Sequence, residues 1–130
     1  MENKRYDIYK CGGCGTVAEI VEGHNCVLNC GNQPMKLLNV GNHTGDAIVH
    51  VPIITHIPDG YFVRVSTEPH PMIPTHYIEF IELTADGKRY KTYLSPGDQP
   101  QAEFTVPLSS AVSSRIYCNL HGVWTSDGKD

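Results

Sequence analysis

The sequence predicts an all-β protein with a small Cys-rich domain at residues 1–38 and an immunoglobulin-like antiparallel β-sandwich at residues 39–130. Four of the five Cys lie within the first 30 residues, which sets this part of the chain apart from the rest. The 12 Gly and 9 Pro favour frequent turns over long helices. After the Cys-rich part, short segments rich in β-branched and aromatic residues alternate with turns, a pattern typical of a β-sandwich.

The first domain is too short to fold by apolar burial alone, because chains below about 40 residues usually need a metal or disulfides. It contains a C-x2-C pair, and the glycines between the two Cys allow the backbone to wrap tightly around a metal. A second pair follows with C-x3-C spacing, which is also within the range of metal-binding knuckles. We therefore expect one zinc or iron ion bound by four thiolates, those of Cys11, Cys14, Cys26 and Cys30.

Two other interpretations of these Cys stay open. They are reduced structural thiols around an incomplete, metal-free site, or the C-x2-C pair is a redox dithiol. The dithiol is the weaker alternative because no βαβ pattern surrounds the pair. The polar N-terminus lacks the apolar stretch of a signal peptide, so we expect a cytoplasmic protein. In that reducing compartment Cys bind metals more often than they form disulfides.

The second domain follows a turn-rich polar stretch, residues 39–46, and from Ile48 onward the pattern is one of strands and turns. Five strands are predicted, at residues 61–66, 77–83, 89–94, 103–108 and 114–118. The segment 77–83 is apolar on both faces, which is typical of a central strand. Asp86–Gly87 indicates a hairpin turn, and Pro107 indicates that its strand ends at an edge. No amphipathic helix is expected.

The charge and hydropathy patterns exclude two classes of partner. The formal net charge is −4 and no basic cluster is present, which argues against nucleic-acid binding. No apolar run approaches the roughly 18 residues that span a bilayer, so we expect no membrane association through a spanning segment.

The β-domain also carries potential metal ligands where loops meet strands. They are His50, His70, His76, Cys118 and His121. A thiolate with several imidazoles suits iron, zinc or copper rather than magnesium or calcium. Spacing alone does not assemble this set, because His50 is far from His121 in the sequence. Three further His, His24, His43 and His56, are interpreted as surface or core residues.

Several motifs of the chain closely resemble the desulfoferrodoxin family of superoxide reductases. They are Pro69–Met72, His76–Leu83, Ala85–Gly87, Leu94–Asp98 and Tyr117–Gly122. The segment Tyr9–Gly15 and the later Pro34–Met35 are similar to the family's desulforedoxin-type domain. The resemblance therefore covers nearly the whole chain.

The resemblance implies a mononuclear non-haem iron with four equatorial His and one axial Cys. Carried over by motif, the equatorial ligands are His50, His70, His76 and His121, and the axial ligand is Cys118. One coordination position, trans to the Cys, would stay open for superoxide, which the iron would reduce by one electron to hydrogen peroxide. A rubredoxin-type electron donor and a homodimer are also implied.

The sequence departs from the family pattern in two places. Family members usually have Glu-Lys directly before the first ligand His, where this chain has Ile48–Val49. That lysine attracts superoxide and helps protonate the product, and the glutamate caps the oxidised iron. We therefore expect an intact iron site with weaker electrostatic capture; Asp46 and His43 lie near in sequence without an assigned role.

The second departure concerns the first domain. The family has two adjacent Cys where this chain has Asn29 and Cys30. A four-thiolate site would therefore need Cys26 to loop back, and otherwise the site stays empty.

Three functions are consistent with these observations. The first is an enzyme, superoxide reductase. The second is a non-catalytic iron-binding or electron-transfer protein of the same fold, and the third is a zinc-stabilised structural β-protein. The enzyme is favoured because all five ligand positions of the family are present, and an iron site with an open position has no simple structural purpose.

Overall fold

The computed structural model describes residues 2–40 and 47–126. The chain divides into two compact units, Met1–Asn39 and Val40–Asp130. The predicted all-β class is confirmed, since the one helix among the described residues is a single turn, α1 (Ala47–His50). No helix in the described part of the chain has the length and apolarity of a membrane span.

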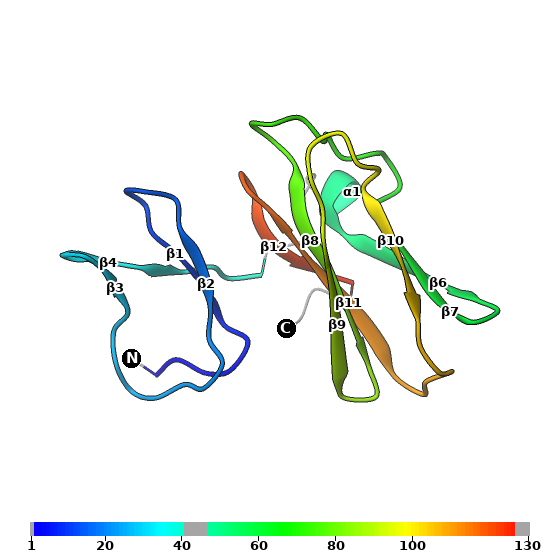
Figure 1. Cartoon of the computed structure of the whole chain (residues 1–130), viewed down its shortest axis with the longest axis horizontal. Helices are drawn as coiled ribbons and strands as arrows, with labels where there is room; N and C mark the ends of the chain where they lie inside the picture. The colour runs from blue at the N-terminus through cyan, green and yellow to red at the C-terminus, as the bar shows by residue number, and fades with distance from the viewer. Residues whose placement is uncertain (1, 41–46, 127–130) are drawn as a thin grey trace. The chain divides into compact units, whose positions relative to one another are not determined.

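The first unit contains two small antiparallel sheets (Figure 1). One has the strand order β2 (Val17–Glu19), β1 (Ile8–Lys10), β5 (Lys36–Leu37), and the other pairs β3 (Asn29–Cys30) with β4 (Gln33–Pro34). Among residues 2–39, the buried apolar side chains are those of Ile8, Tyr9 and Cys11. This apolar core is too small to stabilise the unit by itself.

The second unit is the predicted sandwich of two antiparallel sheets (Figure 1). The first sheet has the order β10 (Gln101–Thr105), β7 (Gly60–Val65), β6 (Pro52–Ile57). The second has the order β12 (Gly122–Thr125), β11 (Val112–Cys118), β8 (Ile78–Ala85), β9 (Lys88–Tyr93). Alternate side chains of both sheets form one apolar core, in which Val63, Ile81 and Ile116 are fully buried.

Strands β7 to β11 correspond to the five predicted strands, and β8 is central, between β11 and β9, as expected. Asp86 and Gly87 connect β8 to β9 with positive φ values of 47° and 84°, as a two-residue type I′ turn requires. Strand β10 lies at a sheet edge and ends at Thr105, before Pro107.

Three elements of the second unit differ from the prediction. Strands β6 and β12 were not predicted, and the helical turn α1 occupies residues where no helix was expected. Strand β6 has the sequence PIITHI, which lacks a clear alternation, and β12 has only four residues. Both are held by pairing with the predicted strands β7 and β11 rather than by their own pattern.

Candidate metal centre

The structure brings together the five predicted ligands of the second unit. Their potential ligand atoms all lie within 4.8 Å of one another, and they belong to His50, His70, His76, Cys118 and His121. His50 is the last residue of α1, and Cys118 is the last residue of β11. The other three His lie in the β7–β8 connection and in the β11–β12 turn. Segments far apart in the sequence therefore converge on one site.

The four imidazoles form a closed ring. Neighbouring centroids are 4.8, 4.7, 5.0 and 4.8 Å apart in the order His50, His70, His76, His121, and each pair is close to perpendicular. His50 Nε2 lies 3.2 Å from His70 Nε2 and 3.1 Å from His121 Nδ1. Neighbouring nitrogens of a square site with metal–nitrogen bonds of about 2.1 Å lie about 3 Å apart. The ring therefore has the size of a metal site.

A hydrogen bond orients His70 toward the centre of the ring, and a buried nitrogen of His76 is left unpaired there. His70 Nδ1 lies 2.7 Å from the carbonyl oxygen of Pro71 and donates to it, which leaves the Nε2 lone pair for a metal. His76 Nε2 is buried and has no hydrogen-bond partner among the described residues. Buried polar atoms are rarely left unpaired, and a metal ion in the ring would satisfy this one.

Burial lowers the pKa of two of these imidazoles and so favours their neutral form. Burial, together with the smaller effect of the other imidazoles, lowers the pKa of His70 to about 4 against the opposing effect of the hydrogen bond to Pro71. Burial and the nearby His121 also lower the pKa of His76. A neutral imidazole is the form that binds a metal, so these side chains are prepared for coordination.

The Cys118 thiol approaches the ring from the protein interior. Cys118 is fully buried within the apolar core, and its Sγ lies 3.7 Å from His121 Nδ1. The pairing of β11 with β8 shifts between Tyr117 and Cys118, and such a bulge changes the direction of the next side chain. His121 is exposed and His76 half-buried, so solvent reaches the ring from their side. No sixth His, Cys, Asp or Glu among the described residues joins the group.

Two residues that the sequence did not single out support the ligands. The Trp124 ring stacks on His50 at 4.9 Å and 13°, and its Nε1 donates to the carbonyl oxygen of His121 at 3.0 Å. Asn119 accepts from the amide of Tyr77 at 2.9 Å and donates to the carbonyl of Thr75 at 3.1 Å. Trp124 is the single Trp of the chain and lies three residues after His121, which was the available signal.

The predicted four-thiolate site of the first unit is assembled only in part. Cys11, Cys14 and Cys30 lie within 4.8 Å of one another, and Cys26 is not among them. The Sγ atoms of Cys14 and Cys30 are 3.6 Å apart, and the Cys14 amide donates to Cys11 Sγ at 3.4 Å. Hydrogen bonds from Thr16 lower the pKa of Cys14 to about 6, whereas the neighbouring Cys11 and Cys14 raise the pKa of Cys30 to about 11.

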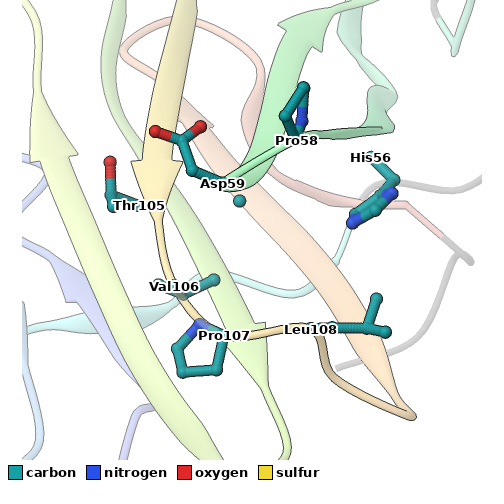
Figure 2. A pocket seen from close by; sticks show the side chains of 8 residues that line it. His56, Pro58, Asp59, Thr105, Val106, Pro107 and Leu108 are labelled. Carbon is teal, nitrogen blue, oxygen red and sulfur yellow. The ribbon is translucent and has the colours of Figure 1, made fainter.

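Two of the remaining His, His24 and His56, lie outside both clusters. His24 is exposed beside Glu22, with 3.0 Å between Nε2 and Oε2. His56 lies near the end of β6 remote from His50, beside a cavity of about 390 Å³ (Figure 2). That cavity is also lined by Pro58, Asp59, Gly60, Thr105, Val106, Pro107 and Leu108. It contributes nothing to the metal centre. His43 and Asp46 lie outside the described residues.

Comparison with known proteins gives the family. The desulfoferrodoxin family model matches residues 42–127, and the model of the desulfoferrodoxin N-terminal domain matches residues 3–38. A desulfoferrodoxin from Nitratidesulfovibrio vulgaris is 45% identical over 123 residues, which cover 95% of this chain and 97% of that protein. The chain belongs to the desulfoferrodoxin family. Membership confirms the resemblance and agrees with iron as the metal of the five-ligand centre.

Solved structures agree with this assignment. The superoxide reductase from Treponema pallidum has a TM-score of 0.74 and 22% identity, covering 92% of this desulfoferrodoxin and 94% of that chain, and it shows the shared fold. A superoxide reductase from Giardia intestinalis has a TM-score of 0.52 and 28% identity, covering 58% of this chain and 92% of that one.

Proposed function

We propose that this desulfoferrodoxin is a superoxide reductase that reduces superoxide to hydrogen peroxide at the iron of the His4Cys centre. The observation that carries the proposal is the ligand set itself. Four imidazoles form a ring, a buried thiolate approaches from the core, and no sixth protein ligand joins them among the described residues. Such a centre has five protein ligands and one free position for a small anion. The likeness to the Giardia superoxide reductase supports the same activity.

The overall step balances with an external reductant. Superoxide takes one electron and two protons to give hydrogen peroxide. Ferrous iron, when bound, supplies that electron and is oxidised to the ferric state. A one-electron donor must then return the iron to the ferrous state, and we propose a rubredoxin-type protein for this role.

The residues of the chain hold the ion and control access to it. The buried Cys118 and His70 shield the inner side from water, while the exposed His121 marks the side from which an anion arrives. The position directly before His50 is Val49, which carries no charge and no proton. Position 49 therefore neither attracts the anion nor protonates the product, and we propose that solvent supplies the protons.

The product stoichiometry tests the proposal. The iron-loaded, reduced protein is mixed under anaerobic conditions with less superoxide than iron, so that every superoxide can receive one electron, and hydrogen peroxide and dioxygen are measured. Reduction yields one peroxide per superoxide and no dioxygen, whereas dismutation yields half as much peroxide together with dioxygen. Cys118→Ser, which replaces the thiolate by a hydroxyl, should lose the activity. Dioxygen evolution, or consumption no faster than with metal-free protein, would refute the proposal.

The second candidate is a non-catalytic iron or electron-transfer protein of the same fold. The uncharged pair Ile48–Val49 favours it, because no cation at these positions attracts superoxide. Reversible oxidation and reduction of the iron without superoxide consumption would support this candidate over the enzyme.

A further inference from the structure

The thiol cluster of the first unit provides three of the four donors that a tetrahedral ion requires. Cys11 is buried, Cys30 is half-buried and Cys14 is exposed, and their Sγ atoms lie within 4.8 Å of one another. Structural zinc sites in proteins are almost always four-coordinate. The identity of the fourth group therefore determines the properties of the site.

Cys26 is held away from this cluster by a buried side chain. Asn3 is 3% exposed, and its Nδ2 donates to the carbonyl oxygen of Cys26 at 2.9 Å and lies 3.7 Å from its Sγ. The same side chain accepts from the amide of His24 at 2.8 Å, and the Asn3 amide donates to the carbonyl of His24 at 3.1 Å. Moving Cys26 to the cluster would break the hydrogen bond from Asn3 Nδ2 to the Cys26 carbonyl and take this acceptor away from a buried amide.

The side-chain oxygen of Gln33 lies beside the thiol cluster. Gln33 is the direct cross-strand partner of Cys30 in the β3–β4 hairpin. Its Oε1 is 3.9 Å from Cys11 Sγ. The amide also lies against Gly13, because a Cβ added there would meet Oε1 at 2.5 Å and Cys11 Sγ at 3.8 Å. Gly13 thus leaves room for the Gln33 amide beside the first knuckle.

We propose that the metal of the first unit is held by the thiolates of Cys11, Cys14 and Cys30, with the side-chain amide oxygen of Gln33 as the fourth ligand and Cys26 outside the site. This differs from the four-thiolate site expected from the sequence. A neutral amide oxygen is a weaker donor to a soft metal than a thiolate, so the fourth position exchanges readily with solvent ligands. A set of three thiolates and one oxygen donor suits zinc better than it suits iron, for which a tetrathiolate centre was the alternative.

Alkylation of the full-length zinc-loaded protein tests which Cys are ligands. Treatment with iodoacetamide followed by peptide mapping should modify Cys26 rapidly and leave Cys11, Cys14 and Cys30 protected. Cys26→Ser should retain the zinc content of wild type in this unit, and Cys30→Ser should lose it. Protection of Cys26 by zinc, or loss of zinc from Cys26→Ser, would overturn the proposal.

Cobalt substitution tests the role of Gln33. With the His4Cys centre kept in the ferrous form, cobalt in the first unit should show thiolate-to-metal absorption for three thiolates. Gln33→Cys should raise that intensity by about a third, because absorption from each additional thiolate adds to the total. Gln33→Ala should speed zinc transfer to a chelator several-fold, whereas Asn32→Ala, in the same exposed turn, should not. A wild-type spectrum and wild-type zinc release in Gln33→Ala would show that Gln33 is not a ligand.

Discussion

At the scale of single residues, the neighbours of the five ligands determine how the centre meets an anion and how firmly it holds iron. Val49 is half-buried and directly precedes His50, so it adds no charge beside the ring. Trp124 contacts two ligands at once, the His50 ring and the His121 carbonyl. Position 49 therefore allows the capture of superoxide to be tested, and Trp124 allows the retention of iron to be tested separately.

A cation at position 49 should accelerate the reaction. Val49→Lys is expected to raise the rate constant for superoxide consumption about fivefold at low ionic strength, equivalent to about 1 kcal/mol from one screened unit charge. The gain should fall as salt increases. Stopped-flow measurements over a series of salt concentrations check this, with Val49→Gln as the uncharged control. An equal gain in Val49→Gln, or no salt dependence of the gain, would contradict the electrostatic explanation.

The hydrogen bond from Trp124 should slow the loss of iron. Trp124→Phe keeps an aromatic ring near His50 but removes the donor to the His121 carbonyl, which is worth about 1 kcal/mol. We expect iron transfer to a chelator to become about fivefold faster. Tyr61→Phe is the matched control, because it removes a buried hydroxyl that bonds to Ser109 on another element. Equal effects of the two variants would show a general loss of stability instead.

The residue-level predictability of the site was uneven. His70 with its two flanking Pro, and Cys118 with His121 at C-x2-H spacing, were recognisable locally. His50 was a potential ligand by residue type, but only the resemblance placed it in one site with the others, because nothing in its local sequence shows that α1 ends beside the β11–β12 turn. Cys26 was predicted as a ligand from spacing, whereas its loop is held by Asn3, a contact 23 residues away in sequence.

At the scale of elements, the hairpin between β8 and β9 is fixed by its turn residues and by a neighbouring loop. The Asp86 carboxylate accepts from the amide of Ala111 at 2.9 Å and from the amide and hydroxyl of Ser110 at 3.2 and 3.0 Å. These hydrogen bonds lower the pKa of Asp86, and the bond from the Ala111 amide has the largest effect. The β8–β9 turn and the loop before β11 are thereby held together.

This interaction predicts a defined pH dependence. The pKa of Asp86 is lower in the folded state than in the unfolded state. The ionised carboxylate therefore contributes to the free energy of unfolding above the unfolded pKa of about 3.9. This stabilisation is lost as the pH falls through the pKa of the folded state. Asp86→Asn should therefore lower the free energy of unfolding at pH 6, and the difference from wild type should shrink below pH 4. Urea unfolding of the metal-free proteins measures this difference, with Asp59→Asn in the exposed β6–β7 turn as control. A difference that stays constant across the range would contradict the role of the carboxylate charge.

Elements with a strong local sequence pattern were predictable, whereas elements that form by pairing with a neighbouring strand were not. The segment 77–83 and the Asp86–Gly87 turn carry their own signals, and they form β8 and its hairpin as predicted. Strand β12, Gly122–Thr125, exists because it pairs with the end of β11 beside the metal centre. The turn α1 has four residues, AIVH, which carry no helical pattern of their own, so no helix was predicted there.

At the scale of the whole molecule, the two units differ in what stabilises them. The second unit has an extensive apolar core drawn from both sheets, whereas residues 2–39 bury Ile8, Tyr9 and Cys11 as their apolar side chains. Apolar burial can stabilise the second unit, whereas we expect the first unit to depend on a metal held by its thiol cluster.

Removal of the metal should therefore affect the two units differently. A chelator that strips the thiol cluster is expected to abolish most of the hydrogen-exchange protection in residues 2–39. The amides of β7, β8 and β11 should keep theirs, since core packing stabilises these strands. Hydrogen exchange with mass spectrometry measures both regions in one experiment, and re-addition of zinc is the control. Unchanged protection in residues 2–39 after complete metal removal would contradict this dependence.

The central claim is that four imidazoles and one thiolate, drawn from distant parts of the chain, surround one iron ion. Anomalous diffraction from crystals of the iron-loaded protein, recorded at the iron absorption edge, tests it most directly. We predict a strong peak inside the ring of His50, His70, His76 and His121, in contact with Cys118 Sγ and with no other protein ligand. A ring without an iron peak, or imidazoles that lie apart, would contradict the account.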